Sequence, residues 1–226
     1  MTADTPPILL ASASPRRREL LSWLGWPFSV VAADVDETGI DAESPPEMVQ
    51  RLSREKARHV AARRPQAVVI AADTTVALDG RSLGKPVDNA EATAMLRALR
   101  NRPHQVYSGL TVIWGEQHLT DLAESLVWMR RYSDDEIAAY VASGDPLDKA
   151  GAYAVQHARF RPAERVEGCF ASVMGFPLCH LTRALAGCGL RAPVDVPAVC
   201  QTRTGFGCRV FGDILDIALR DRGQET

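Results

Sequence analysis

Apolar runs that predict strands alternate along this chain with helices whose first residues carry capping signals, and this alternation most constrains the fold. Residues 67–78 form a long apolar run that is interrupted only by the polar residues 73–75. Strands and helices that alternate in this way predict an α/β domain. The Asp79-Gly80 turn directly after the run predicts a hairpin. We therefore expect a mixed sheet rather than a purely parallel, doubly wound one.

The predicted elements follow one another closely. Strands are expected at residues 7–13, 28–33, 67–78, 105–114, 123–131, 152–156 and 171–174. Helices are expected from Ser14-Pro15 to Gly25 and at residues 44–64, 88–100, 133–143, 177–186 and 214–219. Serine and aspartate residues cap several of these helices, and two of the helices begin with the Ser-x-x-Glu pattern of a capping box. Residues 188–208 are poorly patterned.

The composition excludes several classes of protein. Apolar residues make up 46% of the chain, which supports a sizeable core. A net charge of −2 argues against a general nucleic-acid binder, which is usually basic. No apolar run reaches the roughly 18 residues of a membrane span, and residues 1–7 lack the pattern of a signal peptide. We therefore expect a cytoplasmic protein with no nucleic-acid or membrane partner.

The five cysteines are an odd number without a CxxC pair. In a reducing compartment such cysteines are expected to remain thiols. Cys179, His180 and Cys188 do not have a recognised zinc spacing.

Three consecutive arginines at the start of a helix are the first departure from local rules. Residues 16–18 stand where the partial positive charge of a helix N-terminus disfavours each cation by about 0.3–1 kcal/mol. A bound phosphate would reverse this effect, since backbone N–H groups and arginine forks both bind phosphate. Ser12 and Ser14 can add hydroxyl donors. On this feature alone, a solvated basic turn explains the residues equally well.

Lys56 and Asp73 are charged residues within apolar patterns. Lys56 falls on one helical stripe with apolar residues at 49, 52 and 60, so it is expected on or beside the inward face. Lysine is rarely buried without a partner, although a lysine at the core edge can also reach solvent. Asp73 closes the apolar run of residues 67–72, and a carboxylate at the end of a buried strand lies where α/β folds place ligand chemistry. A carboxylate bonded to loop N–H groups is the alternative for a lone aspartate.

Glu37 and Lys85 add charges on two further loops. Glu37 and Asp73 together can hold a divalent cation through oxygen ligands. Lys85 follows the predicted hairpin and supplies another cation. Two carboxylates and several cations on separate loops suit a substrate in which a metal accompanies a triphosphate. The chain has no GxxxxGK[ST] motif, which excludes a P-loop NTPase.

Five ordered segments resemble the signature motifs of the Maf family. They are LLASASPRR at residues 9–17, ADT at 72–74, GKP at 84–86, SG at 108–109 and DKAGAYAVQ at 148–156. GFPL at 175–178 is similar to the closing Gly-Leu-Pro-Leu of that family. The resemblance spans about residues 8–187, so we expect a Maf-like domain over 1–187 and a C-terminal extension over 188–226. It implies the fold of inosine triphosphate pyrophosphatases, a mixed, elongated sheet flanked by helices with a cleft between two lobes.

The resemblance also implies an activity. Maf proteins cut nucleoside triphosphates between the α and β phosphates with a divalent cation, Mg²⁺ or Mn²⁺, and are often homodimers. The implied catalytic residue is Asp73, which with Glu37 also binds the metal. The implied phosphate-binding residues are Ser12, Arg17, Lys56 and Lys85. A non-catalytic protein that arrests septum formation is an alternative role for this family.

Three positions indicate the base. Arg16, Thr74 and Gln156 match the branch of the family that acts on pyrimidine nucleotides, and the resemblance predicts dTTP and UTP as the best substrates. The other branch acts on 7-methyl-GTP and has Trp, Gln and Glu at these positions. After Gln156 the chain departs from the glycine-rich family pattern and has residues 157–162, HARFRP. The loop near the base is therefore expected to differ from that of other members.

Overall fold

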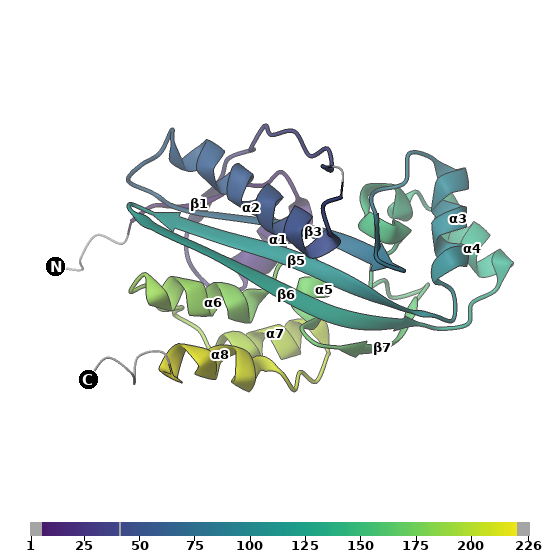
Figure 1. Ribbon diagram of the computed structural model, residues 1–226. Helices are drawn as coiled ribbons and strands as arrows, with labels where there is room; N and C mark the ends of the chain where they lie inside the picture. The colour runs from purple at the N-terminus through teal and green to yellow at the C-terminus, as the bar shows by residue number, and fades with distance from the viewer. Residues whose placement is uncertain (1–5, 41, 221–226) are drawn as a thin grey trace.

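A seven-stranded mixed sheet with helices on both faces forms the centre of the protein (Figure 1). The computed structural model describes residues 6–40 and 42–220. The mixed α/β sheet predicted from the sequence is confirmed. Residues 1–5 and 221–226 lie outside the described residues. The first range belongs to the segment that was compared with a signal peptide, and the second belongs to the expected C-terminal extension. No described helix is long and apolar enough to cross a membrane.

The strands lie in the order β2-β1-β3-β5-β6-β7, and β4 pairs with one end of β3. Only β1 with β2 and β1 with β3 are parallel pairs. The predicted hairpin is formed by β3 and β4 across Asp79-Gly80. The bounds are β1 Ile8–Leu10, β2 Phe28–Val30, β3 Val68–Leu78, β4 Arg81–Leu83, β5 Pro103–Trp114, β6 Gln117–Met129 and β7 Ala163–Glu167.

The helices begin where the capping residues predict. Ser14 accepts a hydrogen bond from the backbone of Arg17, and Asp88 accepts one from Glu91. The α-helices are α1 Pro15–Ser22, α2 Pro45–Ala61, α3 Asn89–Leu99, α4 Asp134–Ala142, α5 Phe170–Val173, α6 Leu178–Gly187, α7 Val196–Thr204 and α8 Phe211–Arg220. Two short 3₁₀ helices, η1 Asp145–Asp148 and η2 Ala150–Ala152, follow α4.

Two of the predicted strands are wrong. Residues 171–174 lie in and just after α5, because a short apolar run does not distinguish a strand from a buried helix. At residues 152–156 the chain leaves η2 without forming a strand, and Gly151 and Ala152 have positive φ angles of 66° and 61° that interrupt an extended path. Two observed elements were not predicted from the sequence. Strand β7 is a largely exposed edge strand, and helix α7 begins after the capping residue Asp195, which could have indicated it.

Strand β3 contributes to three hydrophobic cores, one of which lies under α2 and includes Val69 and Ala71. The first core lies under β1, α1 and α6 and includes Leu10 and Ala72. The second lies under α3 and α4 and begins along β3 at Val76. Along β3, residues 73–75 therefore lie between these first two cores. On this side of β3, β1 pairs only with residues 68–70 and β4 only with 76–78, so among the described strands none pairs here with residues 71–75.

Helices α7 and α8, in the expected C-terminal extension, pack beside α6, on the face of the sheet opposite α2 (Figure 1). Phe206 stacks on Phe170 with ring centroids 4.8 Å apart. All five cysteines are free, as expected. Four of them line one small cavity between α5, α6 and the extension: Cys169, Cys179, Cys200 and Cys208. Burial raises the pKa of Cys169 and of Cys179 to about 12, so these two thiols are neutral near pH 7.

Candidate active site

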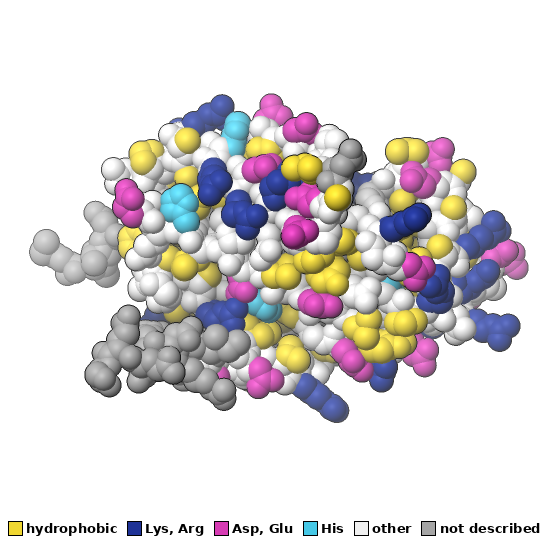
Figure 2. Space-filling model, in the orientation of Figure 1, with side chains coloured by type: hydrophobic (Ala, Val, Ile, Leu, Met, Phe, Trp, Pro, Cys, Tyr) yellow, Lys and Arg dark blue, Asp and Glu magenta, His cyan; other side chains and the backbone are white. Residues whose placement is uncertain are grey.

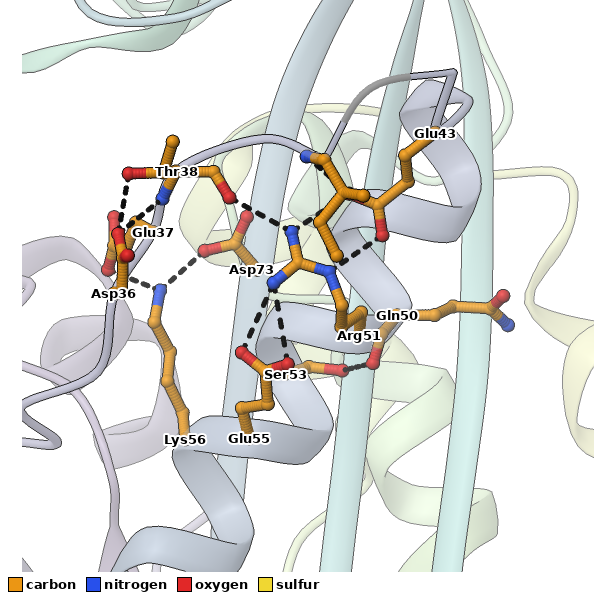
Figure 3. A network of polar contacts seen from close by, with 11 residues as sticks. Asp36, Glu37, Thr38, Glu43, Gln50, Arg51, Ser53, Glu55, Lys56 and Asp73 are labelled. Carbon is orange, nitrogen blue, oxygen red and sulfur yellow. Dashed lines mark hydrogen bonds and ion pairs between the residues drawn. The ribbon is translucent and has the colours of Figure 1, made fainter.

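A buried lysine between two carboxylates forms the centre of the site. Lys56 on α2 places its Nζ 2.6 Å from Oδ1 of Asp73 on β3 and 2.6 Å from Oε1 of Glu37 in the loop before α2 (Figure 3). Lys56 is 5% exposed and Asp73 is 8% exposed, whereas the Glu37 side chain is 59% exposed. The predicted inward position of Lys56 is confirmed, because its ammonium is buried and paired rather than directed into solvent.

Asp73 lies inside β3, in agreement with the strand predicted over residues 67–78, and not at the strand end where ligand chemistry was expected. It is the sixth of the eleven residues of β3, and the strand continues through Thr74 and Thr75. The reason is that antiparallel β5 pairs with β3 along this whole stretch, with Asp73 opposite Gly109. What ends before Asp73 is the neighbouring strand β1. The carboxylate therefore lies just beyond the carboxyl end of the parallel pair, on the α2 face of the sheet.

Gly109 allows α2 to approach the sheet at the position of Asp73. A Cβ atom on Gly109 would lie 2.3 Å from the backbone oxygen of Val49 on α2, far inside contact distance. Since the side chains of directly opposed strand residues share a face of the sheet, Gly109 and Asp73 both face α2. The missing side chain brings α2 close enough for Lys56 to contact Asp73. Gly109 belongs to the short Ser-Gly motif of the sequence, whose structural reason was not evident there.

A second group of polar residues gathers around the backbone oxygen of Gly175. Arg17 donates to it from Nε at 3.0 Å, and Thr74 donates from Oγ1 at 3.4 Å. Oγ of Ser12 lies 3.5 Å from Nη1 of Arg17, and the Thr74 hydroxyl is 2.7 Å from that of Ser108. The structure therefore brings Ser12, Arg17 and Thr74 together at the start of α1. Gly175 itself could be found in the sequence only through the GFPL segment.

Arg17 carries its charge toward the carboxylates. Burial lowers the pKa of Arg17, while the charges of Asp73 and Glu37 oppose that shift, and an arginine in proteins remains protonated. Its half-buried, hydrogen-bonded side chain excludes a fully solvated basic turn as the explanation for this arginine. Arg18 is exposed, which agrees with a solvated basic turn at that position.

Arg16 and Gln156 meet on another side of α1. With the Gln156 amide oxygen directed at Arg16, this oxygen lies 3.2 Å from Nε and 2.8 Å from Nη2 of the guanidinium. Arg16 also pairs with Glu19 one turn along α1 at 2.6 Å. Two of the three predicted specificity residues are thus in contact, and the third, Thr74, is bonded to Gly175 instead.

Lys85 lies on the exposed loop after β4. The backbone oxygen of the preceding Gly84 accepts a hydrogen bond from Gly151 at 3.0 Å, which joins this loop to the segment that leads to Gln156. Burial tends to raise the pKa of Glu37, but the hydrogen bond from Lys56 and the charges of Lys56, Lys85 and Arg17 outweigh it, and the pKa lies below its usual value. Lys85 is therefore within electrostatic range of the Glu37 carboxylate.

The unusual loop after Gln156 is built around an aromatic side chain. Phe160 is buried and stacks on Tyr140 with ring centroids 4.3 Å apart. Arg130 donates to the backbone oxygens of Phe160 at 2.6 Å and Arg161 at 2.9 Å. These contacts fix the loop in place of the glycines that the family pattern has here.

The donor set of the site suits a hard divalent cation that also contacts substrate. Glu37 and Asp73 already share one cation, the ammonium of Lys56. Among the residues that the structure describes, no three His, Cys, Asp or Glu side chains converge as a complete metal site. Mg²⁺ is commonly bound by one or two carboxylates together with substrate phosphates and water. The two carboxylates therefore fit a metal that arrives with a polyphosphate.

Comparison with known proteins identifies the family. Residues 7–188 match the family model "Maf-like protein". A Thermomicrobium roseum protein named "dTTP/UTP pyrophosphatase" is 46% identical over 199 residues, which cover 86% of this chain and 91% of the relative. A Myxococcus xanthus protein of the same name is 48% identical over 193 residues, covering 85% and 98%. The solved "Structure of a HAM1 protein from Coxiella burnetii" matches with 17% identity and a TM-score of 0.40, covering 57% of this chain and 75% of that one. With a family model that spans most of its length, this chain belongs to the Maf family.

Proposed function

We propose that this protein is a nucleoside triphosphate pyrophosphatase that hydrolyses dTTP and UTP to the monophosphate and pyrophosphate. The observation that carries the proposal is the cluster of Lys56, Asp73 and Glu37 beside the basic start of α1. Such a cluster places carboxylates for a metal and a base next to cations for phosphates. The proposal agrees with the activity for which the relatives are named.

Each charged residue has a proposed task. The first turn of α1, with Ser12 and Arg17, binds the phosphate chain through N–H, hydroxyl and guanidinium donors. Lys56 and Lys85 add positive charge where the anhydride bond is broken. A divalent cation held by Glu37 and Asp73 would neutralise the polyphosphate and polarise the α-phosphate.

Asp73 is proposed to accept the proton of the attacking water. Its Oδ1 is held by Lys56, and its Oδ2 accepts no hydrogen bond from the described part of the chain. The water oxygen forms the new bond to the α-phosphorus as the bond to the bridging oxygen breaks, and pyrophosphate leaves. Cleavage at this position requires pyrophosphate, not orthophosphate, as the first product.

The contact between Arg16 and Gln156 supports a preference between pyrimidines. Because Arg16 occupies the amide oxygen of Gln156, the amide N–H₂ group is left to donate. Uracil and thymine present the acceptor O4 to such a donor, whereas cytosine presents an amino group that is itself a donor. A site built on such hydrogen bonds rejects a mismatched edge strongly, because its own polar groups would remain unpaired.

The test is to measure kcat/KM for dTTP, UTP, CTP and 7-methyl-GTP side by side while identifying the products. We expect dTTP and UTP to be the best substrates, with CTP clearly poorer. A higher kcat/KM for 7-methyl-GTP would support the other branch of the family. Nucleotide binding without turnover would support the non-catalytic regulator. The homodimer and the absence of a nucleic-acid partner stay predictions.

A further inference from the structure

The loop that carries Glu37 has little structure of its own. Residues 34–40 form neither helix nor strand, and residues 36–40 are all exposed. Glu37 nevertheless reaches the buried Lys56 with a separation of 2.6 Å. An exposed segment is held in one place only by contacts with a more rigid element. The neighbouring helix α2 is the rigid element that supplies such contacts.

Arg51 on α2 makes that contact with two of its guanidinium nitrogens, Nε and Nη2 (Figure 3). Nε and Nη2 bind the two carboxylate oxygens of Glu43 at 2.7 and 2.8 Å. Nη2 also donates to the backbone oxygen of Thr38 at 3.2 Å, and Nη1 donates to Glu55 at 3.2 Å. The side chains of Arg51 and Glu43 are only 17% and 11% exposed. The guanidinium thus binds the chain before α2 at two points, Thr38 and Glu43.

A local turn transmits this restraint to Glu37. The carboxylate of Asp36 accepts from the backbone N–H of Thr38 at 2.9 Å and from its hydroxyl at 2.5 Å. Residues 36–38 are therefore tied together, and Glu37 lies at their centre. When Arg51 fixes the backbone of Thr38, it also fixes the direction in which Glu37 leaves the loop.

We propose that Arg51 is a positioning residue that holds the Glu37 carboxylate over Lys56 and Asp73 for cation binding. The proposal rests on the proposed function, because Glu37 is there assigned as a metal ligand. Arg51 and Lys56 belong to the same helix, so one rigid element sets the loop and supplies the cation opposite Glu37. On the face of the molecule that Figure 2 shows, charged side chains of both signs intermingle rather than separating into fields of one sign. We therefore assign the effect to specific contacts of Arg51 and not to its net charge.

Metal affinity distinguishes a positioning role of Arg51 from the role of an ion pair that only stabilises the fold. Residues that orient metal ligands typically change metal affinity or activity by 10- to 100-fold when they are replaced. An exposed or rim ion pair would change folding stability slightly and leave metal affinity alone. Lysine cannot reproduce the bidentate fork of arginine, so Arg51→Lys tests geometry at constant charge.

The experiment measures Mn²⁺ binding to the nucleotide-free protein, by the paramagnetic resonance signal of the unbound ion, for wild type, Arg51→Gln, Arg51→Lys and Glu43→Gln. Arg58→Gln is the matched control, since Arg58 is an exposed arginine on the same helix. We expect Arg51→Gln to bind Mn²⁺ about 10- to 100-fold more weakly. Arg51→Lys and Glu43→Gln should also bind Mn²⁺ more weakly than wild type. The control Arg58→Gln should bind Mn²⁺ with the affinity of wild type.

Kinetics provide the second measurement. In Arg51→Gln we expect the Mg²⁺ concentration for half-maximal dTTP hydrolysis to rise by the same factor, while kcat at saturating Mg²⁺ stays within a few fold of wild type. Mn²⁺ affinity equal to wild type in both Arg51→Gln and Glu43→Gln would overturn the proposal, as would a wild type that binds no Mn²⁺. Failure of the proposed function would instead appear as a wild type that binds Mn²⁺ but hydrolyses no nucleotide. Glu43→Gln retains Arg51 and its contact with Glu55, so it remains informative if Arg51→Gln does not fold.

Discussion

Replacing Lys56 by methionine tests the energetics at the centre of the site. The substitution keeps an unbranched side chain of similar length but removes the ammonium that lies 2.6 Å from both carboxylates. Glu37 can turn toward water, because its side chain is 59% exposed. Asp73 cannot, because it is 8% exposed in the middle of a strand. The variant therefore leaves one buried carboxylate without a partner.

The size of the effect follows from that geometry. Removing one partner of a buried ion pair costs about 3–5 kcal/mol, because the remaining charge is uncompensated. Natural domains are stable by about 5–15 kcal/mol, so Lys56→Met should lose a large part of the free energy of unfolding. In the double variant Lys56→Met/Asp73→Asn the buried charge is absent, and we expect most of the loss to be recovered.

Urea unfolding followed by circular dichroism, without added metal, provides the measurement. The free energies of wild type, both single variants and the double variant form a thermodynamic cycle that isolates the pairwise term. If Lys56→Met unfolds within 1 kcal/mol of wild type, on the order of an exposed pair, the reasoning about Asp73 burial is wrong. If the double variant is as unstable as the single one, the loss arises from packing of the lysine stem and not from charge.

Three further predictions follow from the same site and from the second core. Asp73→Asn should lower kcat by about 10²–10⁴-fold while remaining folded, since it removes the proposed base, and near-normal turnover would remove Asp73 from the mechanism. Excess chelator should abolish dTTP hydrolysis and added Mg²⁺ or Mn²⁺ should restore it, so full activity in chelator would contradict the metal assignment. Burial lowers the pKa of His104 in the folded protein to about 4, whereas the ordinary value of 6.5 applies in the unfolded chain. The imidazole is therefore protonated below pH 6.5 in the unfolded chain but only near pH 4 in the folded protein. The free energy of unfolding should therefore fall by about 3 kcal/mol as the pH drops from 6.5 to 4, and a His104→Gln variant with the same slope in that window would refute this cause.

The sequence alone determined the class of fold and the start of most helices. Capping residues such as Ser14 and Asp88 act on backbone groups only three residues away, so their effect can be predicted without knowing the rest of the fold. The hairpin after β3 is local in the same sense. Lys56 and Asp73 were noticeable because each violates an apolar pattern, and the structure accounts for both violations by pairing the two residues.

Tertiary structure decided how these residues are arranged. Asp73 lies inside its strand and not at its end because β5, about 35 residues later in the chain, pairs along the whole of β3. Arg17 and Thr74 meet only through the backbone oxygen of Gly175, which lies more than 100 positions further along the chain. Residues 171–174 lie in and just after a helix, with Ala171 and Met174 packed on the first core, although a short apolar run is equally compatible with a strand. Periodicity and capping report on neighbours within about one helical turn, whereas the site is assembled by packing between segments that no local pattern relates.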